Sequence, residues 1–329
     1  MTNHHPDVHQ PWKQWSENGT LHVATAYVNP LRWRARRLHM NRFRQHMQAS
    51  LNVVLHAGEL AYGDRPFEAT GDDPYDVQLR TSHELWHKEN VLNLVVQRFP
   101  PDWEYGAIVD CDFHFARPDW ALEAIHQLQH FDFVQLFSSY ADLSAEYRPY
   151  RIMPSFAWVY HQERWRPPAK GYAKSSGATG GAWAFRRKAF DAVGGLLDIS
   201  ILGSADWHMA FGLAGMVNTA PESKLCSLPY MEAIQNWQDR ASILKQNIGY
   251  IENHAIHFFH GSKTLRGYGN RWKILRDHNF DPQADIARDW QGVWQLAGNK
   301  PRLRDDIRAY FRSRNEDDPG LRSPERELV

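Results

Sequence analysis

The sequence predicts an α/β protein in which a mostly parallel, mixed sheet is flanked by helices within one large domain. Short apolar runs of strand length alternate along the chain with longer segments of helical spacing, which is the pattern of such a sheet. The 329 residues, 43% of them hydrophobic, are enough for one large core. One apolar run, 107–109, ends abruptly in Asp110 and Asp112, and open α/β sheets bind ligands at the carboxyl ends of their strands. We therefore expect the functional site at this point of the chain.

The first half of the chain is expected to supply most of the sheet. Residues 1–20 form a polar, histidine-rich arm, and Asn29-Pro30 ends the first strand because proline fixes φ and restricts the residue before it. Residues 58–80 are polar and lack periodicity, and a loop of that length is uncommon unless it is functional. In chain order the expected elements are a strand at 21–28, a helix at 31–50, a strand at 51–57, a helix at 84–99, the strand before Asp110, a helix at 118–130 and a strand at 132–137.

The second half opens with an aromatic insertion at 138–176, which fits a packed subdomain and a binding insertion equally well. A glycine-rich turn at 177–187 then leads into a strand, and its glycine spacing matches no phosphate-loop or dinucleotide motif. The further expected elements are helices at 188–193, 201–216, 237–251, 269–277 and 305–313 and a strand at 255–259. The main domain is thus expected to span 21–298, followed at 299–329 by a charged helix and a tail whose last residues, 315–329, have the composition of a disordered segment.

Composition excludes several classes of protein. Lys plus Arg equals Asp plus Glu at 38 each, so no global charge favours a polyanionic partner. The N-terminus has no apolar core of a signal peptide, and no run reaches the roughly 18 apolar residues of a membrane span. Two cysteines require no disulfide framework. We expect a soluble cytoplasmic protein without a membrane span, located in the host cytoplasm if it is of phage origin.

Local charge is less even. Residues 31–48 carry six arginines and no acidic residue, and residues 263–276 carry five basic residues and no acidic one. Each segment is either a solvated helix face or a surface that binds phosphate groups, and the sequence leaves both interpretations open.

Three sets of residues are candidates for the chemistry. Asp110 and Asp112 lie on the same side of an extended segment, where their repulsion would be relieved by a hard divalent cation such as Mg²⁺ or Mn²⁺; solvated turn residues are the alternative. His257 and His260 are spaced for a shared metal if the strand bends, or else are one core and one surface histidine. Asp206, near a helix start, is either a capping residue or a general base.

The order of these motifs resembles the GT-A class of nucleotide-sugar glycosyltransferases, and within it the β-1,4-galactosyltransferase-like enzymes. The resemblance covers roughly 21–277. The family's N-R-A-K-L-L-N, D-V-D, W-G-G-E-D-D-D and M-x-x-H patterns are matched by 88–93 (KENVLN), 110–112 (DCD), loosely 202–208 (LGSADWH) and 257–260 (HFFH). The third motif departs most, with Leu202, Ala205, Trp207 and His208 in place of family residues, so the identities of the donor sugar and the acceptor do not carry over.

The resemblance implies a GT-A, Rossmann-like fold and a metal-dependent transfer of a sugar from a nucleotide-sugar, with inversion. Asp112, His260 and His257 would hold Mn²⁺ or Mg²⁺, Asp110 would contact the ribose or the metal shell, and Asp206 would deprotonate the acceptor hydroxyl. A UDP-sugar is the expected donor. Beside Asp110, the expected donor-binding residues are Asn29, Arg32, Arg37, Lys88, Asn93, Gly180 and Gly181, and the expected acceptor-binding residues are Trp158, Trp183 and Trp207.

Several acceptors and two other classes of function stay open at this stage. The basic segments favour a hydroxymethylated pyrimidine in phage-type DNA, which would have to be flipped out of the duplex. A cytoplasmic glycan, a lipid or a small molecule is the alternative acceptor. The Asp and His residues would also suit a metal-dependent phosphoesterase, which usually needs two metals. Finally, the chain could be a non-catalytic nucleic-acid-binding protein on a degenerate transferase fold.

Overall fold

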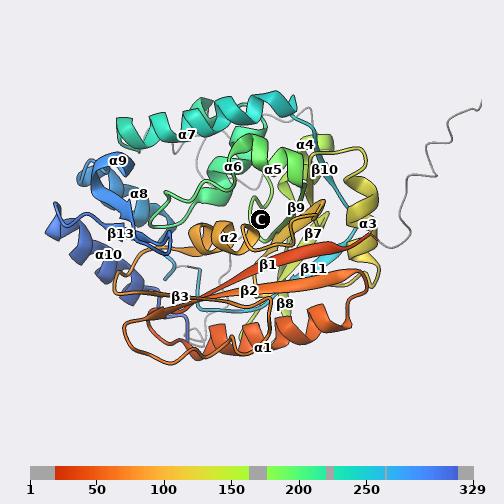
Figure 1. The fold of residues 1–329 in the computed structure, drawn as a ribbon, viewed down its shortest axis with the longest axis horizontal. Coiled ribbons are helices and arrows are strands. Elements are labelled where there is room, and N and C mark those ends of the chain that lie inside the picture. The colour runs from red at the N-terminus through yellow and green to blue at the C-terminus, as the bar shows by residue number, and fades with distance from the viewer. Residues whose placement is uncertain (1–18, 163–175, 220–225, 264, 318–329) are drawn as a thin grey trace, which may run out of the picture.

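A computed structural model describes residues 19–162, 176–219, 226–263 and 265–317 (Figure 1). Its main sheet has seven strands in the order β10-β6-β9-β4-β1-β2-β3, and only β9 runs antiparallel to its neighbours. These strands are β1 (Leu21–Val28), β2 (Val53–Tyr62), β3 (Val77–Thr81), β4 (Tyr105–Val109), β6 (Phe133–Gln135), β9 (Ala182–Arg186) and β10 (Ile248–Tyr250). This mostly parallel mixed sheet confirms the predicted fold class.

Helices cover both faces of the main sheet (Figure 1). Val23 of β1 packs with α1 in one hydrophobic cluster, whereas the next residue, Ala24, packs with α2, α6 and α7 in another, because successive strand residues point to opposite faces. The helices are α1 (Arg34–Ala49), α2 (Lys88–Val96), α3 (Trp120–Gln127), α4 (Phe156–Gln162), α5 (Arg187–Val193), α6 (Ala205–Leu213), α7 (Leu228–Ala241), α8 (Tyr268–Asp277), α9 (Pro282–Asp285) and α10 (Pro301–Ser313), with short 3₁₀ turns at Val217–Thr219 and Ser242–Leu244.

The strand order reverses at β1, which pairs in parallel with both β2 and β4. The chain moves outward from β1 to β2 and β3, then returns through α2 to β4 on the other side. At such a switch point the connections diverge and leave a crevice at the carboxyl ends of the two strands. Asp110 and Asp112 follow β4 and therefore lie at this crevice.

A second sheet lies beside the crevice and has the order β5-β11-β7-β8. Its strands are β5 (Phe113–Phe115), β7 (Ser139–Leu143), β8 (Pro149–Pro154) and β11 (His254–His257), and a separate hairpin joins β12 (Ile286–Arg288) and β13 (Trp294–Leu296). The predicted insertion at 138–176 thus supplies β7, β8 and α4, while its residues 163–175 lie outside the described part of the chain. The predicted arm falls outside it as well, except for residues 19 and 20.

The predicted loop at 58–80 is wrong at both ends, because β2 continues to Tyr62 and β3 begins at Val77. The end of β2 does not read as a strand from hydropathy, because it contains Gly58 and the buried carboxylate of Glu59. A side chain at Gly58 would meet the methyl groups of Val91 and Val95 at 2.6 and 2.5 Å, so glycine lets α2 lie close to the sheet. Glu59 accepts three backbone N–H groups, those of residues 68–70, at 2.6–2.8 Å, and so satisfies its charge inside the fold.

Other predicted boundaries also move. The helix expected at 237–251 ends at Ala241 and is followed by β10, and the helix expected at 84–99 begins only at Lys88. The strand expected at 255–259 is β11, ending at His257, and the helix expected at 305–313 begins at Pro301. Part of the tail expected to be disordered is packed, since Glu316 is buried.

Three of the six arginines in residues 31–48 are paired with carboxylates, so for these three the interpretation as uncompensated charge is wrong. Arg32, Arg36 and Arg44 pair with Glu68, Glu316 and Asp76 at 3.1, 2.7 and 2.7 Å. All three acids lie elsewhere in the chain, so the sequence segment alone could not show them. Within the described residues, none of the helices combines the length and the hydropathy that crossing a membrane requires.

Candidate active site

A cavity of about 640 Å³ lies at the carboxyl ends of β1 and β4. It is walled by the ends of both strands, the start of α2, the loop before β9, the start of α6 and the segment after β11. Of the residues predicted from the sequence, those that line it are Lys88, Asp110, Asp112, Gly180, Gly181, Asp206, Trp207, His257 and His260. Residues as far apart in the sequence as Lys88 and His260, 172 positions, therefore line the same cavity.

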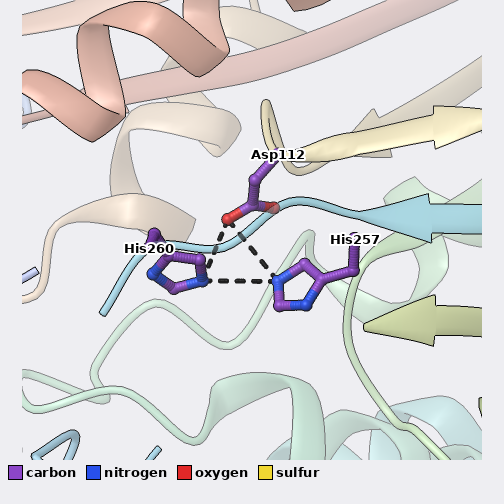
Figure 2. Close-up of side chains that lie close together, drawn as sticks. All are labelled: Asp112, His257 and His260. Atoms are coloured by element: carbon purple, nitrogen blue, oxygen red, sulfur yellow. Dashed lines mark hydrogen bonds and ion pairs between the residues drawn. The ribbon is translucent and has the colours of Figure 1, made fainter. Parts of the chain in front are cut away.

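Asp112, His257 and His260 converge on one point of the cavity wall (Figure 2). The Nε2 atoms of the two imidazoles are 3.3 Å apart, and Asp112 Oδ2 is 3.1 Å from His260 Nε2 and 3.7 Å from His257 Nε2. Asp112 Oδ1 is buried and has no hydrogen-bond partner among the described residues. Three ligand atoms that face one another within 4.8 Å suit a divalent metal ion.

Strand register explains why these residues meet. In the second sheet, β11 pairs with β5 on one side and β7 on the other, so His257 lies opposite Phe113 and Asp142. Asp112 precedes Phe113, and its carbonyl accepts the N–H of Phe258 at 2.9 Å. The ladder ends at His257, and the chain leaves it so that His260 reaches the same side. This is the end of the strand that the spacing of the two histidines required.

Asp142 fixes the orientation of His257, because His257 Nδ1 lies 2.7 Å from Asp142 Oδ1. A proton shared at Nδ1 leaves Nε2 to face the metal position. Burial opposes a charge on His257, but the carboxylates of Asp112 and Asp142 outweigh it and raise the pKa of the imidazole to about 9. His260 is different: burial, with a contribution from Arg266, lowers its pKa to about 3.

Lys88 and Asp110 form an ion pair at the N-terminal end of α2. Lys88 Nζ lies 3.1 and 3.2 Å from the two oxygens of Asp110 and 3.5 Å from Oε1 of Glu89. Although burial opposes its charge, the two carboxylates raise the pKa of Lys88, so it carries a fixed positive charge. Burial raises the pKa of Glu89 to about 7. Glu89 was missed by the sequence reasoning, and its position beside Lys88 in the cavity wall is visible only in the fold.

Asp206 lies in the first turn of α6, beyond a sharp turn in which Ser204 has φ of 83°. Its Oδ2 accepts the hydroxyl of Thr179 at 3.1 Å, and the N-cap of α6 is Ser204 rather than Asp206. A side chain at Gly180 would come within 2.6 Å of Oδ2, so glycine is needed for the loop to lie against the carboxylate. Asp206 therefore lines the cavity and does not cap α6, so the capping interpretation is wrong.

Six predicted residues lie outside the cavity lining. They are Asn29, Arg32, Arg37, Asn93, Trp158 and Trp183. Asn29 bonds the backbone N–H and carbonyl of Trp33, and Asn93 bonds both groups of Leu196, so each amide holds a turn. Arg32 pairs with Glu68 and Arg37 is exposed.

The two tryptophans in this group are packed into the core. Trp183 is buried and donates to the carbonyl of Thr179 at 2.8 Å, while Trp158 packs against the larger hydrophobic cluster. Neither tryptophan lines the cavity.

The basic segment at 263–276 also turns inward. Arg266 and Arg271 are each 5% exposed and line the cavity, as does Lys263, which pairs with Asp142. Lys273 pairs with Asp277 on the surface. Part of the segment therefore forms the wall of the cavity, whereas Lys273 and Arg276 stay on the surface. Its charges looked available in the sequence because their surroundings come from other segments.

Neither a scan against protein-family models nor a search of curated proteins gives a match. Among solved structures, the catalytic domain of Drosophila β1,4-galactosyltransferase 7, in complex with xylobiose, is 11% identical, covers 87% of this chain and 97% of its own, and has a TM-score of 0.38. A Desulfovibrio desulfuricans G20 protein assigned as a nucleotide-diphospho-sugar transferase is also 11% identical, covers 73% and 81%, and has a TM-score of 0.34. A Bacillus anthracis protein assigned as a glucose-1-phosphate thymidylyltransferase is 11% identical, covers 79% and 96%, and has a TM-score of 0.35. At these TM-scores the backbones overlap loosely, so function must be argued from the residues of the site.

Proposed function

We propose that this chain is a metal-dependent glycosyltransferase of the GT-A type, which moves a sugar from a nucleotide-sugar to an acceptor hydroxyl with inversion. The observation that carries the proposal is the meeting of Asp112, His257 and His260 in one cavity with Asp206 and the Lys88–Asp110 pair. This cavity lies at the switch point of an α/β sheet, where such folds bind their ligands. A UDP-sugar is the proposed donor.

Each group has a place in that reaction. A bound divalent cation would supply charge stabilisation to the leaving nucleoside diphosphate. Lys88, which is paired with Asp110 and Glu89, would add a second positive charge in the wall of the same cavity. Asp206, held by the hydroxyl of Thr179, accepts the proton of the attacking hydroxyl. One base and one leaving group stabilised by a metal favour a single displacement with inversion.

The ligand set favours Mn²⁺ over Mg²⁺. Two imidazoles and one carboxylate suit transition-metal ions, whereas Mg²⁺ demands an octahedron of oxygen ligands. The same two-histidine, one-carboxylate set also holds Fe²⁺ in oxygenases. Activity is measured with a panel of divalent metal ions, and oxygen uptake is recorded beside it. Oxygen uptake would indicate an oxygenase, because sugar transfer consumes no dioxygen.

The other two classes of function receive less support. Within the described residues one group of three His and Asp ligands meets, whereas two-metal hydrolysis of a phosphodiester needs a second ion about 4 Å away. A non-catalytic nucleic-acid-binding protein would gain affinity from exposed basic residues, but Arg266 and Arg271 are buried in the cavity wall.

A hydroxymethylated pyrimidine in DNA remains one proposed acceptor, beside a glycan, a lipid or a small molecule. Arg34 and Arg37 of α1 are exposed, whereas the other exposed basic residues that motivated it, Arg32, Lys273 and Arg276, are each paired with a carboxylate. Duplex binding should then fall steeply with salt. Binding that does not change between 50 and 200 mM salt, or that is absent, would remove DNA from the list.

The function is tested by adding Mn²⁺ with a panel of nucleotide-sugars to the purified protein and measuring thermal stabilisation. A ligand that binds only the folded state stabilises it by about 2.7 kcal/mol at a hundredfold excess over its dissociation constant. Stabilisation by one nucleotide-sugar that depends on the metal supports the proposal and names the donor class. Equal stabilisation without metal, or none with any donor, would contradict it.

Metal binding should release close to one proton at pH 7. In the metal-free site His257 has a pKa of about 9 and is protonated, whereas His260, with a pKa of about 3, is already neutral. A metal must displace the proton on His257, so affinity should rise about tenfold per pH unit up to about pH 9 and level off above it. Calorimetry in buffers of different ionisation enthalpy counts the proton. An affinity independent of pH from 6 to 9 would contradict the assignment of His257 as a ligand.

Substituting Gly180 with alanine should lower turnover without weakening the metal site. The new methyl would lie 2.6 Å from Asp206 Oδ2, so the base must move. Misplacement of a reacting group by about 1 Å can cost about a hundredfold in rate. Release of nucleoside diphosphate and Mn²⁺ affinity are measured on the same preparation. Unchanged turnover would show that the close contact of Gly180 with Asp206 has no part in the reaction.

A further inference from the structure

The last described residues of the chain return to the candidate metal site. Asn315, Glu316 and Asp317 follow α10 and lie against the segment after β11, where a side chain at Gly261 would meet the Cα of Glu316 at 2.8 Å. Asp317 accepts the backbone N–H groups of Arg34 and Ala35, both at 2.9 Å, and so caps α1. The end of the described chain is thus fixed between α1 and the residue that follows His260.

Glu316 is buried between two arginines. Its side chain has no exposed surface; Arg36 donates to its two oxygens at 2.7 and 2.8 Å, and Arg314 donates to Oε1 at 2.8 Å. Burial alone would favour the protonated acid, but the two guanidiniums hold the pKa of Glu316 well below its usual range. A carboxylate held so firmly in its charged form is a fixed hydrogen-bond acceptor.

The second oxygen of this carboxylate faces the metal site. Glu316 Oε2 lies 3.8 Å from Nδ1 of His260, on the side of the ring away from Asp112 and His257. At His257 the corresponding carboxylate is closer, since Asp142 Oδ1 lies at hydrogen-bond distance, 2.7 Å, from Nδ1, whereas the 3.8 Å at His260 is an ion-pair distance. Each imidazole therefore has a buried carboxylate on its Nδ1 side and turns its Nε2 toward the common point. Metal-bound histidines commonly use such a carboxylate to fix the tautomer and the ring orientation.

We propose that Glu316 is a positioning residue of the metal centre: its carboxylate accepts the Nδ1 proton of His260, so that Nε2 offers its lone pair to the metal. The inference deepens the proposed function and rests on its metal site. It makes the segment after α10 part of that site, although it lies more than 50 residues beyond His260 in sequence. Glu316 acts through His260 and contacts no substrate.

The test compares Glu316→Gln with Asp317→Asn and uses Mn²⁺ alone, without a donor. Glutamine keeps the size of the side chain but removes the charge that binds the imidazole proton. We expect Mn²⁺ affinity, measured by electron paramagnetic resonance, to fall about 10- to 100-fold. Asp317→Asn weakens the other anchor of the same segment and leaves Glu316 in place. It should lower thermal stability while Mn²⁺ affinity stays at the wild-type value.

The visible absorption spectrum of bound Co²⁺ adds a readout of ligand geometry that a purely structural role would not change. The spectrum should change in Glu316→Gln and match the wild type in Asp317→Asn. An affinity within threefold of the wild type for Glu316→Gln overturns the inference. Equal losses in both variants also overturn it, because docking of the segment, rather than the carboxylate, would then be responsible.

Glu316→Gln leaves two buried guanidiniums around a neutral amide, which destabilises the fold. If that variant does not fold, Arg36→Gln combined with Glu316→Gln is compared with Arg36→Gln alone, since the pair differs only at residue 316. The same fall in Mn²⁺ affinity supports the inference, and no difference overturns it. If the wild type itself binds no Mn²⁺, both the metal site of the proposed function and this inference fail. If the wild type and the Glu316→Gln variant bind Mn²⁺ equally, only this inference fails.

Discussion

Asp112→Asn should abolish the metal-dependent part of donor binding. Asp112 is the one carboxylate among the three proposed ligands, and its Oδ2 lies 3.1 Å from His260 Nε2. Asparagine keeps the shape but loses the negative charge that offsets a divalent cation beside a buried histidine pair. The thermal stabilisation of the wild type, about 2.7 kcal/mol at a hundredfold excess of ligand over its dissociation constant, should disappear in the variant.

The matched control is Asp119→Asn, the same chemical change at a surface carboxylate whose partner is Arg117. It should respond to Mn²⁺ and the donor like the wild type. The free energy of unfolding without metal should fall in Asp112→Asn, because protonated His257 loses one of the two carboxylates that raise its pKa. Donor and metal binding are therefore compared at a temperature where both proteins are folded. Retention of metal-dependent donor binding by Asp112→Asn would contradict the proposed metal centre and, with it, the role of His257 and His260.

Asp206→Asn should lose turnover and keep both metal and donor binding. Asp206 is not among the three proposed ligands, and its Oδ2 accepts the hydroxyl of Thr179. Removing a general base costs about 10²- to 10⁴-fold in rate. The readout is release of nucleoside diphosphate at saturating donor and acceptor, next to the thermal stabilisation by Mn²⁺ and donor, which should match the wild type.

Glu89→Gln is the informative comparison, because burial raises the pKa of this cavity carboxyl to about 7, a value that suits proton transfer. If Asp206 is the base, Glu89→Gln should change donor affinity through Lys88 and leave most of the turnover. If Glu89→Gln is inactive while Asp206→Asn is active, Glu89 and not Asp206 is the base. Full turnover by both variants would show that neither carboxylate is the base.

The sequence identified those site residues that carry a local signal. Asp110 and Asp112 follow an apolar run, so their position at a strand end could be predicted from hydropathy. His257 and His260 end another apolar run, and Asp206 follows a glycine turn. Each of these is a feature of a few neighbouring residues, and the structure brings all five into one cavity.

The residues predicted to bind that lie outside the cavity lining include amides and indoles without such a signal. Asn29 and Asn93 serve backbone groups of Trp33 and Leu196, and Trp183 serves the carbonyl of Thr179. An amide in a turn and an indole in the core have the same residue types as a sugar-binding group. Only the direction of the side chain separates them, and that direction is set by packing.

The sequence by itself thus determined the α/β class and the main strands, as well as the residues that deliver charge to the crevice, because hydrophobic periodicity and chain punctuation are local properties. The tertiary structure decided which charges are paired and which residues support the ligands. Arg36 finds its carboxylate 280 residues away in Glu316, and His257 finds Asp142 only through the register of β11 with β7. Such partners lie far apart in sequence and leave no periodic pattern, since their pairing is fixed by the packing of whole elements and by the free-energy cost of burying an uncompensated charge.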